Sequence, residues 1–394
     1  MSRPILLCTV GTSLVYPNLS GLRRTLAEDG GKPDNKKTIA PTLAAAADRL
    51  ADAFDAKNWD AVAAALAEFP GDARLCGAEV NSIASLIKHG YAPDGAGIFF
   101  FHSDTDDGRQ IADVLVRLFR QRGHDPVEVV AVPDLQDKDA KRFRTKGLRN
   151  LAKLLCSKVR DYTQAACAIN ATGGYKAQIA VAVLLGQALG IPVYYMHERF
   201  SEIIAFPPMP VALDFEVWMR FSGWLTAMEK NFVPRAAVEE DGWDERYEGL
   251  VEADRDEQGC ELLSLSATGQ IFHETFRHRF RTDCDRVLPP TAEPGRKRPA
   301  VLHDHAVINL LRGELMRYLG RVTDEVQQVV QCVTSYSNPD LPEYTRFRER
   351  GGEVEGVYSD GTRTVKFKVE TTAITAGQRA AVVAALNEWL SCQG

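Results

Sequence analysis

Short apolar runs that alternate with helical segments fill residues 4–211 and limit the folds that this part of the chain can adopt. The runs typical of strands are residues 4–10, 97–105, 127–133, 165–170, 192–198 and 202–211. The segments with helical spacing are residues 42–67, 78–90, 108–123, 146–162 and 175–190. Such alternation is typical of a doubly wound α/β sheet, in which helices cover both faces of parallel strands. We therefore predict an α/β fold here.

Three loops follow the predicted strands at the edge where such sheets bind ligands. They are Gly11-Thr12-Ser13, residues 103–105 (Ser103, Asp104 and Thr105) and residues 171–176. Ligands of open α/β sheets lie beyond the carboxyl ends of the strands. The sequence therefore predicts a ligand site at this edge.

The pattern changes after residue 213, and the length of 394 residues favours two or three domains. Residues 213–295 are predicted as a helical or winged-helix connector, and a Pro/Gly-rich linker spans residues 288–299. The last region, residues 296–394, has the pattern of helices, then two or three antiparallel strands with a turn at 359–362, then a closing amphipathic helix. The predicted domains are 1–212, 213–295 and 296–394.

The composition of the chain argues against several classes of protein. A net charge of −6 argues against a protein that coats nucleic acid, although residues 296–394 carry 13 basic and 12 acidic side chains, a net of +1. The eight cysteines form no C-x-x-C pair, as expected for reduced thiols. The N-terminus lacks the pattern of a signal peptide, and no apolar run approaches the length of a membrane span. We expect a cytoplasmic protein.

The loop "INATGGYKAQ" has the features of an anion-binding turn. Gly173 and Gly174 permit close backbone approach of a ligand, and the N-terminus of the following helix is partly positive. Lys176 adds a full charge, while Asn170 and Thr172 offer an amide and a hydroxyl. The loop matches neither the P-loop nor the dinucleotide fingerprint. A tight turn with a solvated lysine remains the alternative from these residues alone.

Together with "LLCTVGTSL" near the N-terminus, this loop closely resembles the CARF domain, a Rossmann-fold sensor of cyclic oligoadenylates in type III CRISPR systems. The resemblance covers about residues 1–211. It implies a homodimer that binds one cyclic oligoadenylate across its two-fold axis, with cyclic tetra-adenylate the commonest activator of the family. The residues that would line the pocket are Gly11, Thr12, Ser13, Asn170, Thr172, Gly173, Gly174, Tyr175 and Lys176, with residues 103–105 as further candidates.

CARF proteins usually control a nuclease, and three kinds can be weighed here. A HEPN ribonuclease needs Arg-x4–6-His on a helix; Arg298 and His303 have that spacing, but Pro299 argues against a helix. A PD-(D/E)xK nuclease needs metal-binding carboxylates and a Glu-x-Lys strand. "SATGQIFHETF" is similar to the helix that opens such domains, and the spacing of Glu353, Glu355 and Asp360 is unspecific. The candidate strand "VKFKVETT" has its lysines before the glutamate.

The third kind is a RelE-type mRNA interferase, a small α+β fold whose order of elements residues 301–390 resemble. RelE-like enzymes use no metal and no cofactor, and they act on mRNA in the ribosome, so the resemblance implies both as partners. Attack by the RNA's own 2′-hydroxyl requires cations near the phosphate and a proton-transfer group. The candidate catalytic residues are Arg346, Arg348, Arg363, Lys366, Lys368 and Tyr358, with Arg350 and Tyr344 nearby.

Within this set, "SDGTRTVKF" resembles the RelE segment in which a functional arginine follows a hairpin turn, which favours Arg363. The preceding strand, "EVEGVY", lacks the lysines of that family, so the acid and base stay open, with His303 and His305 as substitutes. Strand alternation puts Arg363 on the face opposite to Lys366 and Lys368. Any one of these cations could instead be merely solvated.

Two further predictions concern the remaining parts. The apolar stripe of the closing helix is expected to pack on its own domain, or alternatively to dock another protein; its members are Val382, Val383, Leu386, Trp389 and Leu390. A winged helix in the middle region would instead make the protein a ligand-gated transcription regulator.

Overall fold

The structure is a computed structural model that describes residues 2–28, 39–197, 202–208, 213–339 and 343–393. The chain divides into two compact units, Met1–Ala212 and Leu213–Gly394. Each unit has its own sheets and core, and each is described by itself below.

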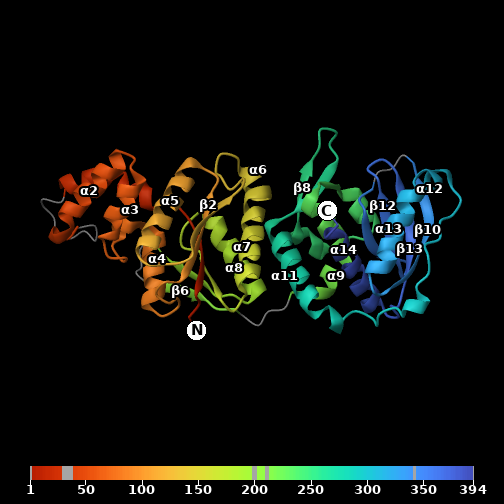
Figure 1. The fold of residues 1–394 in the computed structure, drawn as a ribbon. Coiled ribbons are helices and arrows are strands. Elements are labelled where there is room, and N and C mark those ends of the chain that lie inside the picture. The colour runs from red at the N-terminus through yellow and green to blue at the C-terminus, as the bar shows by residue number, and fades with distance from the viewer. Residues whose placement is uncertain (1, 29–38, 198–201, 209–212, 340–342, 394) are drawn as a thin grey trace. The chain divides into compact units, whose positions relative to one another are not determined.

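The first unit is built on a six-stranded sheet with the order β3-β2-β1-β4-β5-β6 (Figure 1). Its strands are β1 (Ile5–Thr9), β2 (Gly97–Ser103), β3 (Val127–Val132), β4 (Cys167–Asn170), β5 (Val193–Met196) and β6 (Ile203–Phe206). Strands β1 to β5 are parallel, and β6 pairs antiparallel with β5. The predicted α/β class is confirmed. Residue 198 of one predicted strand and residues 209–211 of the next lie outside the described residues.

Helices cover both faces of this sheet (Figure 1). Helices α4 and α5 lie on one side, with α2 and α3 packed outside α5, and helices α7 and α8 lie on the other. The bounds are α1 (Leu22–Glu28), α2 (Ala44–Asp55), α3 (Trp59–Ala67), α4 (Gly77–Lys88), α5 (Asp106–Gln121), α6 (Ala140–Arg142), α7 (Leu148–Tyr162) and α8 (Lys176–Leu189). Because both faces are covered, every residue of β1 and β2 is buried, which is why these strands are continuous apolar runs.

The second unit begins with helices around a small sheet. The elements are α9 (Phe215–Lys230), β7 (Val233–Pro234), α10 (Arg235–Glu240), β8 (Val251–Arg255), β9 (Glu261–Leu265) and α11 (Ala267–Asp283). The three strands pair antiparallel in the order β7-β9-β8. This region therefore contains a strand hairpin in addition to the predicted helices.

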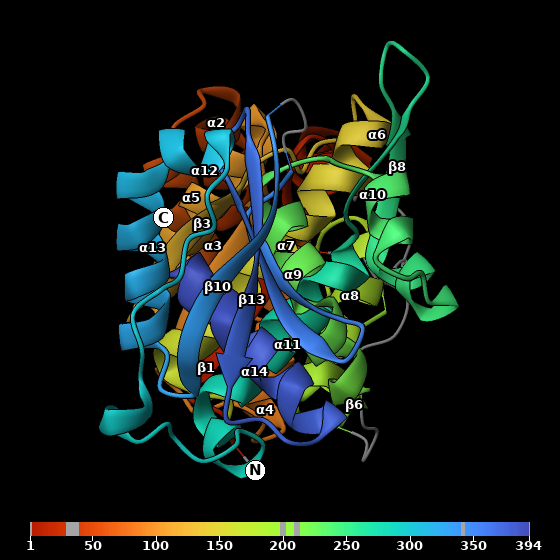
Figure 2. The same ribbon diagram turned by 90° about the vertical axis from the view of Figure 1, so that its right-hand side faces the viewer.

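The rest of the second unit is a four-stranded antiparallel sheet with helices before and after it. The elements are α12 (Ala306–Leu310), α13 (Arg312–Glu325), β10 (Val329–Asn338), β11 (Arg346–Arg350), β12 (Glu353–Ser359), β13 (Thr364–Thr371) and α14 (Ala376–Ser391). The strand order is β10-β13-β12-β11. Helices α13 and α14 share one apolar cluster with this sheet, and β10 and β13 pass in front of α14 in Figure 2.

The regions predicted as connector and C-terminal domain pack into one unit. Ala380 and Ala384 of α14 lie in the same apolar cluster as Trp218 and Trp224 of α9. The stripe on α14 is thus used inside its own unit, with Val382, Val383 and Leu386 buried against the sheet. A linker at residues 288–299 does not separate two cores, because the helices on either side of it share one.

Strand β13 follows the predicted alternation. Val365, Phe367 and Val369 are at most 2% exposed and face the helices, whereas Lys366 and Lys368 lie on the other face and are only partly buried. The two lysines therefore share a face that excludes the apolar side chains of the same strand.

Candidate functional site

The strand order of the first unit reverses between β1 and β4, which lie side by side at the centre of the sheet. Strands β2 and β3 continue to one side of this point, and β5 to the other. The chain leads from β1 to helices on one face of the sheet and from β4 to α8 on the other, and an open α/β sheet binds its ligands at such a point. The predicted loops, residues 11–13 and 171–176, both lie at this position.

The two loops contact each other closely. The Thr9 hydroxyl donates a hydrogen bond of 2.5 Å to the carbonyl of Gly173. A Cβ on Gly11 would lie 2.5 Å from the nitrogen of Gly174, so a larger residue would force the loops apart. Gly174 has a φ of +97°, which other residues rarely adopt, and a Cβ there would overlap the amide of Gln178. The glycines are thus required for loop packing, whatever the ligand.

A buried carboxylate that the sequence did not single out joins these loops. Glu79, in the first turn of α4, is 1% exposed. Its Oε1 accepts a 2.6 Å hydrogen bond from the Gly11 N–H, and its Oε2 accepts one of 3.4 Å from the Ser13 hydroxyl. Burial raises the pKa of this carboxyl, while the Gly11 N–H and the Ser13 hydroxyl lower it by less. The signal available in the sequence was a glutamate on the apolar face of α4, spaced with Ile83 and Leu86.

The predicted ligand-binding residues divide into two sets. Asn170 is 1% exposed and donates to Ser82, and it accepts a 2.6 Å hydrogen bond from the Thr172 hydroxyl. The same hydroxyl accepts from the Met196 N–H at 3.1 Å. These side chains shape the loop from inside. The exposed members of the predicted set are Thr12, Gly174 and Lys176.

Lys176 starts helix α8 and is exposed. A cation at this end of a helix is locally unfavourable, because the helix dipole is positive there. Local rules of this kind are typically broken at functional sites. Lys176 and the first N–H groups of α8 together form an electropositive point beside the two glycines, suited to an anion.

Tyr175 connects this point to the neighbouring loop. Its ring meets that of Phe143 edge to face, with 5.1 Å between the centroids. Burial and the nearby Asp137 raise the pKa of its hydroxyl, which keeps it protonated as a hydrogen-bond donor. The loop after β3 therefore lies beside the glycine loop.

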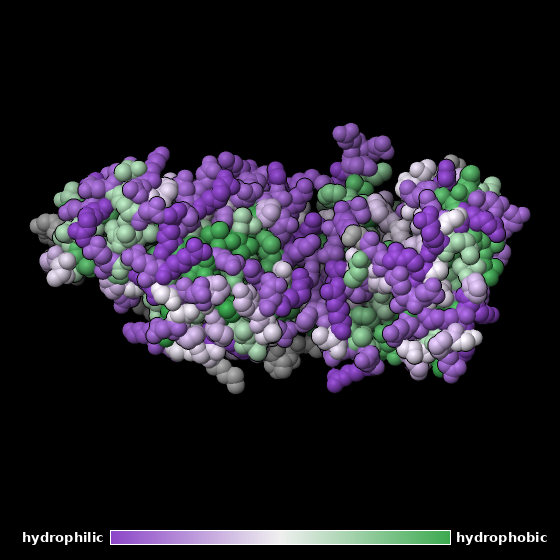
Figure 3. Space-filling model, in the orientation of Figure 1, coloured by the Kyte–Doolittle hydropathy of each residue, from purple (hydrophilic) through white to green (hydrophobic). Residues whose placement is uncertain are grey.

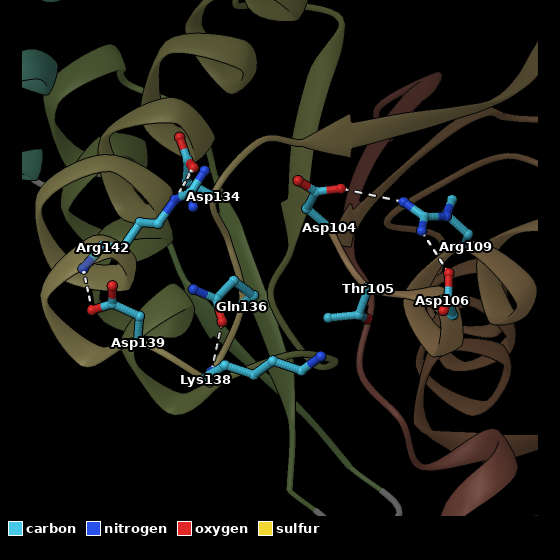
Figure 4. Close-up of a pocket in the computed structure, with 9 residues that line it drawn as sticks. All are labelled: Asp104, Thr105, Asp106, Arg109, Asp134, Gln136, Lys138, Asp139 and Arg142. Atoms are coloured by element: carbon cyan, nitrogen blue, oxygen red, sulfur yellow. Dashed lines mark hydrogen bonds and ion pairs between the residues drawn. The ribbon is translucent and has the colours of Figure 1, made fainter.

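A polar hollow of about 490 Å³ opens beyond the carboxyl ends of β2 and β3 (Figure 4). On one wall Arg109 pairs with Asp104 and Asp106, at 3.3 and 2.6 Å. On the other wall Arg142 pairs with Asp134, and its N–H bonds to Asp139. The complete lining is Asp104, Thr105, Asp106, Arg109, Asp134, Gln136, Lys138, Asp139 and Arg142. The candidates Asp104 and Thr105 thus line a hollow, whereas Ser103 is buried.

In Figure 4 the side chain of Lys138 extends from the β3 loop toward Thr105 on the opposite wall. The hollow is lined by acidic, basic and neutral polar side chains, which supply both hydrogen-bond donors and hydrogen-bond acceptors. It therefore suits a polar heterocycle or a sugar better than a bare anion.

In the second unit, two of the predicted catalytic arginines are buried in ion pairs. Arg346 is 2% exposed, pairs with Asp241 at 3.0 Å and Glu343 at 3.1 Å, and lies 4.0 Å from the ring centre of Trp224. Arg348 pairs with Asp241 and, at 2.5 Å, with Glu355. A catalytic role for Arg346 and Arg348 requires access to RNA, but Trp224 of α9 and Asp241 after α10 cover this end of β11.

The other predicted catalytic side chains are more open. Lys366 pairs with Glu343 at 2.7 Å, and Lys368 pairs with Glu353. Arg363 is 37% exposed in its side chain and lies 3.7 Å from Asp360. These three cations lie on β13 or in the turn before it. Arg350 is exposed at the end of β11, and the Tyr344 hydroxyl donates to the Phe232 carbonyl at 2.6 Å.

Tyr358 lies on the face of the sheet that packs against α13. Its hydroxyl donates to Glu314 at 3.3 Å, and burial together with Glu314 raises its pKa. Val365 lies opposite Tyr358 in the register, two residues from Arg363.

The two candidate histidines, His303 and His305, lie beside β10. His305 is exposed, and its Nδ1 lies 2.7 Å from the hydroxyl of Ser337, which pairs with Val365 in the register. His303 lies 3.3 Å from the Thr334 hydroxyl. The segment from Arg298 to His303 is not helical: Val301 bridges to β10, and Arg298 pairs with Glu370 at 2.5 Å. The helical geometry that a HEPN motif requires is therefore absent at Arg298.

In the ranges given above, no helix is long and apolar enough to cross a membrane. Among the same residues, no three His, Cys, Asp or Glu side chains group as a metal ion would require.

The fold and the edge of its sheet define an α/β protein with a candidate anion-binding site at the point of strand reversal. Residues 74–209 match the model of a family described as CRISPR-associated protein (Cas_APE2256). This stretch includes Glu79, the glycine loop and the hollow, and it supports the predicted CRISPR association. No curated protein matches the chain.

Proposed function

We propose that the first unit is a CARF-type sensor that binds a cyclic oligoadenylate at the carboxyl edge of its sheet. The observation that carries this proposal is Lys176 on the first turn of α8, beside Gly173 and Gly174 at the strand reversal. A helix N-terminus and a lysine favour a phosphate group. The family match over residues 74–209 supports a role in CRISPR defence.

The hollow beside the glycine loop favours a nucleotide over a simple anion. It would accept a base or ribose while a phosphate of the same molecule contacts Lys176. Gln136 can pair with the hydrogen-bonding edge of adenine, as glutamine does in other nucleic-acid complexes. The homodimer, the type III assignment and cyclic tetra-adenylate as the activator rest on the resemblance of the two loops to CARF domains.

We further propose that the second unit is a metal-independent endoribonuclease of the RelE type. In such a reaction the RNA's 2′-hydroxyl loses its proton and attacks the adjacent phosphorus. The bond to the 5′-oxygen breaks, that oxygen takes up a proton, and a 2′,3′-cyclic phosphate remains. Arg363 is the strongest candidate to stabilise the phosphorane, because it is the most exposed arginine of the predicted set on these strands.

His305 is the candidate for proton transfer. Its Nδ1 can accept hydrogen bonds from the Ser337 hydroxyl and, at 3.4 Å, the Val307 N–H. A neutral imidazole that accepts at Nδ1 carries its proton at Nε2. As a general acid, the imidazolium form of His305 would give its Nε2 proton to the leaving oxygen and become a neutral imidazole that keeps its proton at Nδ1, facing the Ser337 hydroxyl.

The charge pairing in the second unit favours this chemistry over a PD-(D/E)xK site. Glu355 is paired with Arg348, and Glu353 with Lys368, so both carboxylates already have protein cations as partners. A divalent metal would have to displace these cations.

The net charge of the middle region argues against the alternative of a winged-helix transcription regulator. Residues 235–265, which include α10 and the hairpin of β8 and β9, carry 11 acidic and 3 basic residues, a net of −8. The projecting tip of this hairpin is hydrophilic in Figure 3. A surface of this sign repels the DNA backbone.

The test is RNA cleavage by the full chain, with free mRNA and with ribosome-bound mRNA, with and without cyclic tetra-adenylate, each in EDTA and in Mg²⁺. The proposal expects cleavage that requires the ligand and persists in EDTA. Cleavage abolished by EDTA would favour the metal-dependent nuclease, and ligand-dependent binding of an operator without cleavage would favour the regulator.

A further inference from the structure

We propose that Glu79 is a positioning residue whose negative charge limits the affinity of the sheet edge for an anionic ligand. This inference rests on the proposed ligand site and assigns it a regulatory group. The carboxylate lies beneath the two loops that would receive the phosphate, and it takes the Gly11 N–H that a phosphate could otherwise use.

The geometry places Glu79 at the contact between the loops. Its Oε1 occupies the space where Gly173 lacks a Cβ, and it lies 3.4 Å from the Cβ that Gly11 would have. The Ser13 hydroxyl contacts its Oε2 and also accepts a 3.0 Å hydrogen bond from the N–H of Ala78. Glu79 thus holds residues 11–13 against α4 and the glycine loop from the inside.

The described groups that face the carboxylate from β1, its loop and the loop after β4 are neutral. From β1 and its loop it faces the Cys8 thiol, the Gly11 N–H and the Ser13 hydroxyl. The loop after β4 contributes Gly173. Each of these groups is uncharged, since burial raises the pKa of the Cys8 thiol far above its ordinary value. Hydrogen bonds and the N-terminus of α4 therefore stabilise an ionised Glu79.

The charge of a buried carboxylate acts on a nearby like charge through the protein interior, where the repulsion is stronger than it would be through water. A ligand phosphate at Gly174 and Lys176 would meet the field of Glu79 across the loop contact. Protonation of Glu79 removes that repulsion and keeps a hydrogen-bond acceptor for the Gly11 N–H. Ligand affinity should therefore rise as the pH falls through the pKa of this carboxyl.

The test compares the full-length wild type with Glu79→Gln by calorimetric titration with cyclic tetra-adenylate from about pH 5 to about pH 8. Glutamine keeps the acceptor for Gly11 and removes the charge. We expect the wild type to bind more weakly as the pH rises, and the variant to bind roughly tenfold more tightly than the wild type at the upper pH, with a flatter profile. The control is Asp94→Asn, which removes one exposed charge from the turn before β2, at the opposite edge of the sheet.

A Glu79→Gln variant that binds with the wild-type affinity and pH profile would overturn the inference while leaving the proposed sensor intact. A wild type that binds no ring at any pH would instead contradict the proposed function. In that case, thermal unfolding over the same pH range tests whether Glu79 carries a buried charge. If it does, the wild type should be less stable than Glu79→Gln at the upper pH. Equal unfolding temperatures of the wild type and Glu79→Gln would then contradict the proposed effect of the Glu79 charge.

Discussion

Arg346 and Asp241 form an ion pair of 3.0 Å in which both side chains are less than a tenth exposed. Asp241 ends α10, and Arg346 begins β11, so the pair joins the small helical region to the C-terminal sheet. Asp241 also accepts a 3.0 Å hydrogen bond from the indole of Trp224, whose ring lies against Arg346. Asp241 therefore pairs with both buried arginines, Arg346 and Arg348, which Glu343 and Glu355 also contact.

Asp241→Asn is predicted to destabilise the protein strongly. Removing one partner of a buried ion pair leaves uncompensated charge, which typically costs about 3–5 kcal/mol. Denaturant unfolding, followed by the tryptophan fluorescence of the second unit, should show a loss of about 3 kcal/mol. Glu257→Ala, an exposed change in the β8–β9 hairpin, is the control and should have little effect. Wild-type stability of Asp241→Asn would show that the junction does not depend on this charge.

Gly173→Ala is predicted to disrupt the candidate ligand site. Its Cβ would overlap the Glu79 carboxylate and lie 2.6 Å from the Thr9 carbonyl, so the two loops would separate. We expect lower thermal stability and loss of ligand binding. In contrast, Gly313→Ala in α13 meets no atom within 4 Å and should stabilise its helix by roughly 0.5–1 kcal/mol. Retained binding by Gly173→Ala would contradict the described loop packing.

Lys176→Ala is predicted to weaken ligand binding roughly tenfold or more, as expected for the loss of a hydrogen bond between charged groups. The salt dependence of binding should also decrease, because one contact between charges is removed. Lys153→Ala, an exposed change on α7, is the matched control. Fluorescence anisotropy with a labelled cyclic tetra-adenylate at several salt concentrations measures both effects. Unchanged affinity would remove Lys176 from the site.

The stability of the second unit is predicted to fall in acid partly through Glu343. Burial raises the pKa of this carboxyl, but Lys366 and Arg346 outweigh burial and hold it below its ordinary value. The unfolded state therefore binds the proton more readily, and the stabilisation is complete above the unfolded pKa of about 4.3. It is lost as the pH falls through the lower folded value. Glu343→Gln should show a smaller acid-induced drop in unfolding temperature than the wild type, and an identical drop would be the contrary result.

Arg363→Ala is predicted to reduce ligand-activated RNA cleavage by about a hundredfold or more, the usual cost of removing one group that stabilises a transition state. Ligand binding to the first unit should be unaffected. Arg255→Ala, an exposed arginine in the β8–β9 hairpin, is the control. Cleavage rates under single-turnover conditions separate this effect from RNA binding. Full activity of Arg363→Ala would exclude Arg363 as a catalytic residue.

The α/β class of the first unit could be predicted because its strands are buried on both faces. β1 and β2 read as continuous apolar runs, and each is followed by polar loop residues at the carboxyl edge. The alternation of β13 could be predicted for a related reason, since one face packs against helices and the other carries Lys366 and Lys368.

The pairings between distant residues could not be predicted in the same way. Gly11 and Glu79 are 68 positions apart, and Asp241 and Arg348 are 107 apart. The residue types of Arg346 and Arg348 predicted a catalytic role, but their burial depends on which other elements cover the strand. Here α9 and α10 supply Trp224 and Asp241, and no local pattern in β11 indicates that cover.

The most direct test of the central claim is calorimetric titration of the full chain with cyclic tetra-adenylate near neutral pH. We predict saturable binding with one ring for two chains, which is lost in Gly173→Ala and weakened in Lys176→Ala. A linear tetra-adenylate of the same charge should bind more weakly. Binding that is absent, or that Gly173→Ala and Lys176→Ala leave unchanged, would contradict the claim that this edge of the sheet is the sensor.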